Sequence, residues 1–170
     1  LARSHDVLSV HTPSADGMWW HTDHNAKITY LNELLQHVRT TYGANTAALW
    51  LVGYSGGSEF ITRYFFPHRA NDIETGGFLV FGGGDAPGPE WTGSFSQYAK
   101  SNLSLNLVTG ESDRTADYDA LGGAQETAAF YRSAGFEHVW SHWPQEHDHL
   151  TITHEFGTYL GTVIDAYDEE

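Results

Sequence analysis

Apolar residues along this chain follow two kinds of pattern that alternate, and these patterns predict strands and helices in turn. Short runs that are apolar or rich in β-branched residues are typical of strands. They predict strands at residues 6–10, 47–52, 77–81, 103–108 and 138–143. Between them, apolar residues recur every three or four positions, which is typical of helices with one buried face. This alternation predicts an α/β fold, a mostly parallel sheet with helices on both faces.

Turn-forming residues set the bounds of the predicted helices and loops. The first helix is expected to start at an N-cap, Asp23 or Asn25, and the second to be closed by Pro67. The Gly- and Pro-rich stretch at 82–93 predicts a long loop that forms a wall of the active site. The helices are predicted between Asp23 and Gly43, from Phe60 to Pro67, at 120–134 before Gly135, and at 156–167.

Composition then narrows the classes of protein to which the chain can belong. Its formal net charge is −14, from 22 acidic residues against 8 basic ones, and such a surface repels nucleic acid and anionic membranes. The sequence has no cysteine, which excludes disulfides, thiolate nucleophiles and cysteine-bound zinc. No apolar run is long enough to span a membrane. The chain begins at Leu1 and shows no signal peptide, so we expect a processed or truncated product.

The strongest chemical signal is a G-x-S-x-G motif at residues 53–57. It lies between a predicted buried strand and a predicted helix, the position in which such a motif forms a sharp turn that exposes the serine hydroxyl. We expect the two outer glycines to allow close approach of the chain segments. Ser55 is therefore the predicted nucleophile, and the Gly56 N–H the predicted oxyanion donor at the start of the helix.

A serine hydroxyl needs a base, and the base needs an acid that orients it. The loop after the predicted strand 103–108 contains Asp113, which we assign as the acid. After the last strand, His147 and His149 both fit the position of the base, and His149 is favoured because Asp148 and His149 directly precede the last helix. Three further carboxylates of the same loop are rivals of Asp113, namely Glu111, Asp117 and Asp119. Two further histidines, His142 and His154, are expected to be structural.

The motif at 53–57, the loop ending at Asp113 and the late histidine together resemble the α/β-hydrolase superfamily. The resemblance covers nearly the whole chain, as a single catalytic domain over residues 1–170. It is closest to small secreted carboxylesterases of the feruloyl-esterase and polyhydroxyalkanoate-depolymerase types. It implies a Ser55–His149–Asp113 triad, an acyl-enzyme intermediate, a small-molecule or polymer ester as substrate, and no cofactor. It also favours an extracellular or cell-envelope location.

The sequence departs from that superfamily at its beginning. Several strands and a loop with the second oxyanion donor normally precede the strand predicted here at 6–10, but only residues 1–5 do so. We therefore expect an N-terminally truncated fold, the C-terminal portion of the catalytic domain, whose sheet a missing segment or a second chain completes, or else a minimal variant. Loss of one oxyanion donor lowers a rate by roughly 10²–10³. A non-catalytic binding protein, a peptidase and an acyltransferase of the same fold are the alternatives.

Aromatic residues near the motif are the predicted substrate contacts. These are Tyr54 within the motif and the pair Trp19 and Trp20, which the sequence places in a loop beside the site. Eleven histidines also suggest metal binding, and the tightest pairs of them are His21 with His24 and His147 with His149. No third ligand is evident, and a zinc site needs three or four, so no metal is predicted.

Overall fold

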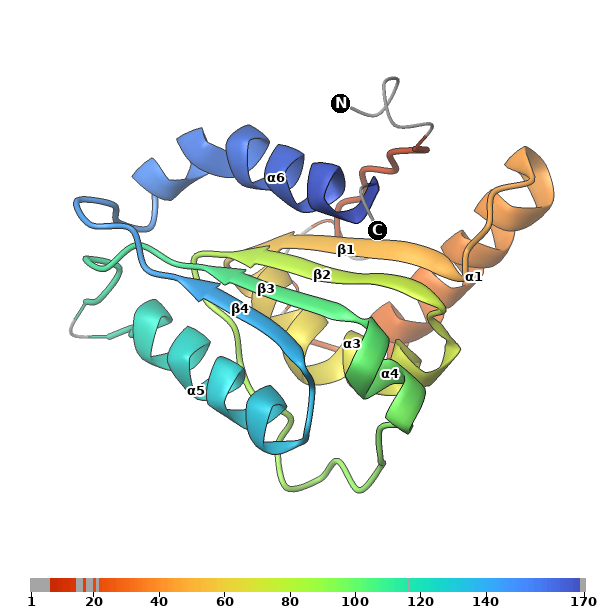
Figure 1. The fold of residues 1–170 in the computed structure, drawn as a ribbon, viewed down its shortest axis with the longest axis horizontal. Coiled ribbons are helices and arrows are strands. Elements are labelled where there is room, and N and C mark those ends of the chain that lie inside the picture. Colours follow the sequence, from red (N-terminus) through yellow and green to blue (C-terminus); the bar gives the residue numbers. More distant parts are fainter. Residues whose placement is uncertain (1–6, 15–16, 18–19, 21, 116, 169–170) are drawn as a thin grey trace.

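The computed structural model describes residues 7–168 of the chain except 15, 16, 18, 19, 21 and 116. Four parallel strands form one sheet in the order β1-β2-β3-β4 (Figure 1). They are β1 (Ala48–Tyr54), β2 (Thr75–Phe81), β3 (Ser104–Val108) and β4 (His138–His142). The longer helices are α1 (His24–Tyr42), α4 (Gln97–Asn102), α5 (Ala120–Ser133) and α6 (Phe156–Asp168).

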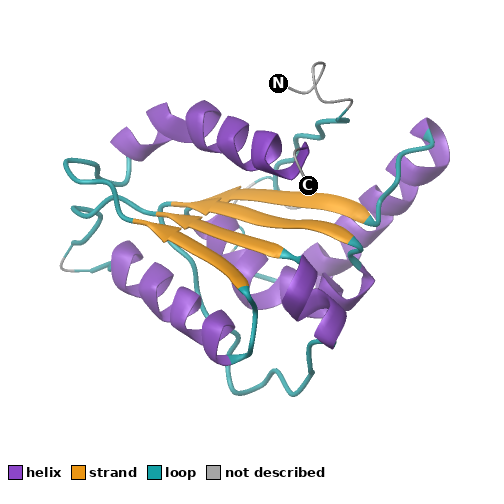
Figure 2. Ribbon diagram, in the orientation of Figure 1, coloured by secondary structure: helices purple, strands orange, loops and turns teal. Residues whose placement is uncertain are grey.

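Helices cover both faces of the sheet, as Figures 1 and 2 show. Helix α6 covers one face, where Phe81 and Val108 pack against its apolar side. The opposite face carries the larger core, in which Phe78, Leu105 and Tyr131 of α5 are fully buried. Neighbouring residues of β2 therefore point into different cores, as the alternation of side chains in a strand requires. The predicted α/β fold with helices on both faces is confirmed.

Four of the five predicted strands are present, each within two residues of its predicted bounds. The strand predicted at 6–10 is wrong. Residues 7–10, the part of it that the structure describes, form no strand, and the Val7 and Leu8 side chains are 43% and 50% exposed. An apolar run becomes a strand only where a partner takes its backbone hydrogen bonds and a core covers its side chains, and this segment has neither.

Strand β1 was predicted to be fully buried, and this too is wrong. It pairs only with β2, so that it forms one edge of the sheet in the part of the chain that the structure describes. Most of its residues are half-buried, and Val52 is 49% exposed. The apolar run predicted the strand correctly but could not reveal its place in the sheet.

One prediction about a helix end is also wrong, whereas Asp23 stands at the N-cap of α1 as predicted. The helical chain does not close at Pro67 but runs on to Asp72, because a π-helix, η1 (Phe60–Phe65), precedes the proline. In a π-helix the N–H of residue 67 would donate to the Thr62 carbonyl, but Pro67 has no N–H. The Tyr131 hydroxyl donates to that carbonyl instead, at 2.5 Å. At the start of α1, Asp23 stands at the N-cap in a left-handed conformation without a side-chain cap bond.

Candidate active site

Ser55 lies at the bend between β1 and the short helix α2 (Gly56–Glu59) with a strained backbone. Its φ of 53° and ψ of −125° lie outside the regions that residues with a side chain prefer. The bend is fixed because the Ser55 N–H donates to the Phe81 carbonyl at the end of β2, at 2.9 Å. The buried Ser58 hydroxyl donates to the same carbonyl, at 2.7 Å. These bonds fasten the turn that carries the serine to the neighbouring strand.

The glycines of the motif do not contribute equally. A Cβ at Gly53 would stand 2.9 Å from the Gly57 backbone and 2.7 Å from the Ile61 side chain, closer than packed atoms tolerate. A Cβ at Gly57 would meet only Trp20, at the ordinary distance of 3.9 Å. The expected close approach is therefore made at Gly53, and the Gly57 position has room for a side chain.

The carboxyl ends of β1, β3 and β4 bring three predicted side chains together. His149 Nε2 lies 2.9 Å from Ser55 Oγ, and His149 Nδ1 lies 2.9 Å from Asp113 Oδ2. Ser55 follows β1, Asp113 lies in the loop after β3, and His149 lies in the loop after β4. These ends meet at the edge of the sheet on the left of Figure 1. A nucleophile, a base and an acid at hydrogen-bond distances form a geometry suited to nucleophilic catalysis.

Asp113 differs from its rivals in the acid loop by its burial. Its side chain is 3% exposed, whereas Glu111 and Asp117 are exposed to solvent. Asp119 has another role, because its Oδ1 accepts a hydrogen bond from Gly122 N and caps α5. Asp113 is held by its own backbone, since its N–H donates to the Gly110 carbonyl and its carbonyl accepts from Leu121 N. It is thus the carboxylate of this loop that reaches the imidazole.

The two candidate histidines have different surroundings. The structure brings the His149 ring to both Ser55 and Asp113. His147 contributes its backbone, whose carbonyl accepts a 3.0 Å hydrogen bond from Ser112 N. That bond joins the loop after β4, which carries His149, to the loop after β3, which carries Asp113. His142, expected to be structural, stacks on Trp140 of the same strand with ring centroids 5.5 Å apart.

Tyr54 and a glycine support the His149 imidazole. The Tyr54 hydroxyl donates to the His149 carbonyl at 2.6 Å, and the two ring centroids lie 5.0 Å apart. Burial, and then the negative charges of Asp113 and Asp148, raise the pKa of the Tyr54 hydroxyl, so that it keeps its proton and stays a donor. Gly82 has a φ of 60°, and a Cβ there would stand 3.3 Å from His149 Nδ1. Tyr54 thus braces the imidazole, and its contact with a substrate stays a prediction.

A small cavity opens beside the start of α2. It has a volume of about 90 Å³, and Trp20, His24, Gly56, Glu59, Phe60, Tyr64 and Asp85 line it. The Trp20 ring packs on Phe60, with centroids 4.9 Å apart. Trp20, predicted to contact the substrate, therefore lies next to the predicted oxyanion donor. Its predicted partner Trp19 lies outside the described residues.

Within the described part of the chain, no group of three or more His, Asp or Glu side chains could hold a metal ion. No described helix is long and apolar enough to cross a membrane.

Sequence reasoning missed several residues of the site. Asp148 shapes the turn that contains His149, because its Oδ1 accepts hydrogen bonds from Thr151 N and Thr151 Oγ1 at 2.8 and 2.9 Å. Asp148 and Thr151 are three positions apart, the spacing of a capping turn, and this signal could have been used. Glu59 and Tyr118 meet across the site although they are 59 positions apart in the chain. No local pattern predicts such a contact.

Comparisons with known proteins show the fold and no closer relationship. No family model matches the chain, and no curated protein matches its sequence. Two solved structures of SOBER1 from Arabidopsis thaliana are similar, each at 14% identity over 91% of this chain. One is a variant, with a TM-score of 0.64 over 70% of its length, and the other has a TM-score of 0.63 over 69%. The likeness supports an α/β-hydrolase type of fold.

Proposed function

We propose that this chain is a serine hydrolase that cleaves carboxylic esters through an acyl-enzyme intermediate. The observation that carries the proposal is the pair of 2.9 Å hydrogen bonds that join Asp113 to His149 and His149 to Ser55. The strained backbone of Ser55 adds support, because strain of this kind is kept where the surrounding structure fixes a functional side chain.

Each residue has a defined part in this reaction. Ser55 Oγ attacks the ester carbonyl while His149 Nε2 takes its proton, and His149 then returns the proton to the leaving alcohol. Asp113 accepts the hydrogen bond of Nδ1–H, which holds the imidazole in the required tautomer. The Gly56 N–H belongs to the first helical turn and has no acceptor one turn earlier, so that it can donate to the developing oxyanion. Water then releases the acid, and no cofactor takes part.

The cavity beside Gly56 and Trp20 is the proposed site for part of the substrate. Its volume of about 90 Å³ suits a group of a few heavy atoms. Its aromatic lining suits an apolar or aromatic part of an ester, in line with the resemblance to feruloyl-esterase and polyhydroxyalkanoate-depolymerase types. An extracellular or cell-envelope location, and a segment or second chain that pairs with the open edge of β1, are part of the same proposal.

Hydrolysis of a short-chain p-nitrophenyl ester tests the proposal. We expect turnover by the native chain and its loss in Ser55→Ala, because no other group replaces the nucleophile. Ser133→Ala is the control, since this exposed serine at the end of α5 bonds only to its own helix in the contacts described. Native protein without turnover, or Ser55→Ala with native turnover, would contradict the proposal.

The choice of base has its own test. His149→Ala should reduce kcat by a factor on the order of 10³ or more, because the serine loses the group that takes its proton. His147→Ala should keep most of the activity, since that residue bonds to the acid loop through its backbone, which the substitution retains. The reverse pattern in kcat would assign the base to His147.

A further inference from the structure

We propose that Tyr118, held by Glu59, is a positioning residue that keeps the His149 imidazole in line with Ser55. The inference rests on the proposed function, since it concerns how the proposed base is kept in place. Neither residue belongs to the triad, and no sequence motif identifies them.

The contacts of Tyr118 place it between the base and the helix that follows the nucleophile. Its ring stands nearly perpendicular to the His149 ring, at an interplanar angle of 84° with centroids 5.9 Å apart. Its hydroxyl donates to Glu59 Oε1 at 2.8 Å. Glu59 is the last residue of α2, the helix that Ser55 precedes. Tyr118 therefore links the loop that carries Asp113 to α2, next to the imidazole.

The segment that carries Tyr118 is also the one that carries Asp113, and several of its described residues bond to one another. The Thr115 N–H donates to the Tyr118 carbonyl at 2.7 Å, and the Tyr118 N–H donates to Thr115 Oγ1 at 3.0 Å. Arg114 and Asp119 pair across the base of this turn, through an isolated β-bridge and a 3.4 Å ion pair. A shift of Tyr118 is thereby transmitted to the backbone next to Asp113.

The hydroxyl of Tyr118 stays a donor over the range in which an esterase works. Burial first, and then the hydrogen bond to the Glu59 carboxylate, raise the pKa of Tyr118 far above its ordinary value. A hydrogen bond from a neutral hydroxyl to a charged carboxylate is stronger than one between neutral groups. The link between the acid loop and α2 is therefore a charge-assisted hydrogen bond, and because Tyr118 is 38% exposed, solvent weakens it in part.

Two tyrosine rings thus flank the imidazole, and the two are held differently. Tyr54 lies at 5.0 Å and is bonded to the backbone of His149 itself. Tyr118 lies at 5.9 Å and is bonded to α2. The side chain of His149 is one-third exposed, so that packing alone does not fix the ring. Small displacements of a catalytic group cost large factors in rate, and the Tyr118–Glu59 bond limits them.

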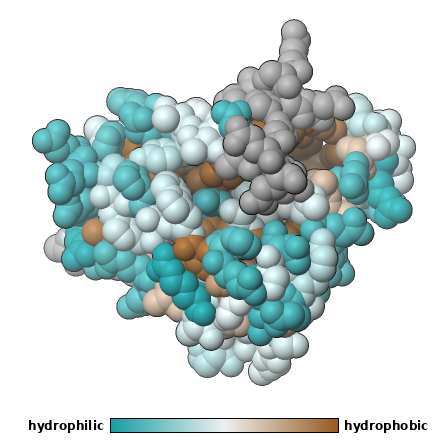
Figure 3. All heavy atoms as spheres, in the orientation of Figure 1, coloured by the Kyte–Doolittle hydropathy of each residue, from teal (hydrophilic) through white to brown (hydrophobic). Residues whose placement is uncertain are grey.

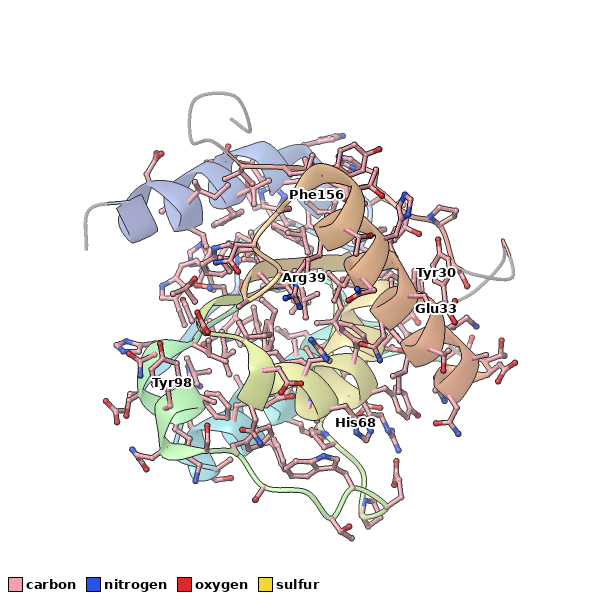
Figure 4. The ribbon with its side chains drawn as sticks, turned by 90° about the vertical axis from the view of Figure 1, so that its right-hand side faces the viewer. Tyr30, Glu33, Arg39, His68, Tyr98 and Phe156 are labelled. Atoms are coloured by element: carbon pink, nitrogen blue, oxygen red, sulfur yellow. The ribbon has the colours of Figure 1, made fainter. Side chains whose placement is uncertain are left out.

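Removal of the Tyr118 hydroxyl tests the inference while the ring is kept. In Tyr118→Phe we expect kcat to fall about five- to tenfold, the range expected for loss of one hydrogen bond that is partly open to solvent, with KM changed less than about twofold. The matched control is Tyr98→Phe, which removes a hydroxyl that bonds to the Glu74 carbonyl. Figure 4 shows Tyr98 on α4, well apart from Phe156, which packs beside Tyr54 at the site. This control should keep native kcat.

Glu59 gives a second, independent measurement. Glu59→Gln keeps an oxygen that accepts the tyrosine hydrogen bond, so its kcat should exceed that of Glu59→Ala, whereas Glu59→Ala should lower kcat at least as much as Tyr118→Phe. In the Glu59→Ala background, Tyr118→Phe should change kcat less than about twofold, because the bond is already gone. Should Tyr118→Phe fold poorly, the Gln and Ala variants of Glu59 test the same bond.

The outcomes separate this inference from the proposed function. Native protein without ester turnover removes the proposed function. If the native chain hydrolyses the ester and Tyr118→Phe has the same kcat, only the positioning role is overturned. If Tyr118→Phe lowers kcat five- to tenfold both in the native chain and in Glu59→Ala, the positioning role is also overturned, because Tyr118 would then act without its partner.

Discussion

At the scale of single residues, the candidate site depends on one strained serine and on what holds it. Ser55 keeps a positive φ because its N–H is bound to the end of β2 and because Gly53 lets the following helix approach. A serine in relaxed backbone would not be aimed at His149 in the same way. The geometry of the site is therefore a property of the turn and its neighbours as much as of the motif.

Asp113 provides the residue-scale prediction. Asp113→Asn should lower kcat by a factor on the order of 10³–10⁴ without unfolding the chain, because an amide in place of the carboxylate favours the wrong imidazole tautomer. The matched control is Asp117→Asn, an exposed residue of the same loop, which should keep native kcat. Ester kinetics and a thermal melt on both variants check this. A native rate in Asp113→Asn would assign the acid to a neighbouring carboxylate.

At the scale of elements, the sequence predicted what depends on local pattern and missed what depends on distant partners. Strands β2 and β3 are rich in apolar residues and were predicted closely. The run at 6–10 has as many apolar residues as β3, but its described part, residues 7–10, has no partner strand, and no local feature distinguishes the two cases. Helix α4 was missed because its six residues are mostly polar and too few to show a helical repeat.

The candidate site shows the same division. The motif at 53–57 predicted the position of Ser55, and chain order predicted Asp113 and a late histidine. Glu59 and Tyr118, which we propose to position the imidazole, come together only when the sheet brings the loops after β1 and β3 to one edge. The motif and the chain order therefore predict the candidate triad, whereas this contact depends on the fold.

The turn that presents His149 gives the element-scale prediction, a dependence on pH. Hydrogen bonds from the Thr151 N–H and hydroxyl lower the pKa of Asp148. The pKa of Asp148 is lower in the folded chain than in the unfolded chain, so its charged carboxylate stabilises the turn at pH values above the unfolded pKa of about 4. This stabilisation is lost as the pH falls through the pKa of Asp148 in the folded chain. Asp148→Ala should therefore lower Tm at pH 7 and have less effect near pH 3.

Thermal melts of the native chain and of Asp148→Ala at both pH values check this. A difference in Tm that stays the same from pH 7 to pH 3, or that grows on acidification, would show that the charge of Asp148 does not hold the turn.

At the scale of the whole molecule, two features matter beyond the fold. Strand β1 leaves an edge of the sheet open among the described residues, next to the strand end that carries Ser55. The surface is also strongly acidic, with a formal net charge of −14. On the side seen in Figure 3, hydrophilic residues surround smaller hydrophobic patches. Self-repulsion of a surface of one sign opposes compact folding, and salt screens it.

The molecule-scale prediction concerns this repulsion. Addition of about 0.5 M NaCl should raise Tm at pH 7, because screening is nearly complete over a few ångströms at such ionic strength. The matched control is the same addition near pH 5.0, the isoelectric point of the sequence, where the effect should be much smaller. Differential scanning calorimetry checks both. A Tm that falls with salt at pH 7 would mean that attractive ion pairs outweigh the repulsion.

The central claim is that Ser55 is a nucleophile activated by His149 and Asp113. The most direct measurement is reaction with a fluorophosphonate, followed by mass spectrometry of the peptides to locate the adduct. We expect one adduct, on Ser55 in the native chain, formed far more slowly in His149→Ala and not at all in Ser55→Ala. An unmodified native chain, or an adduct that persists on another residue in Ser55→Ala, would contradict it.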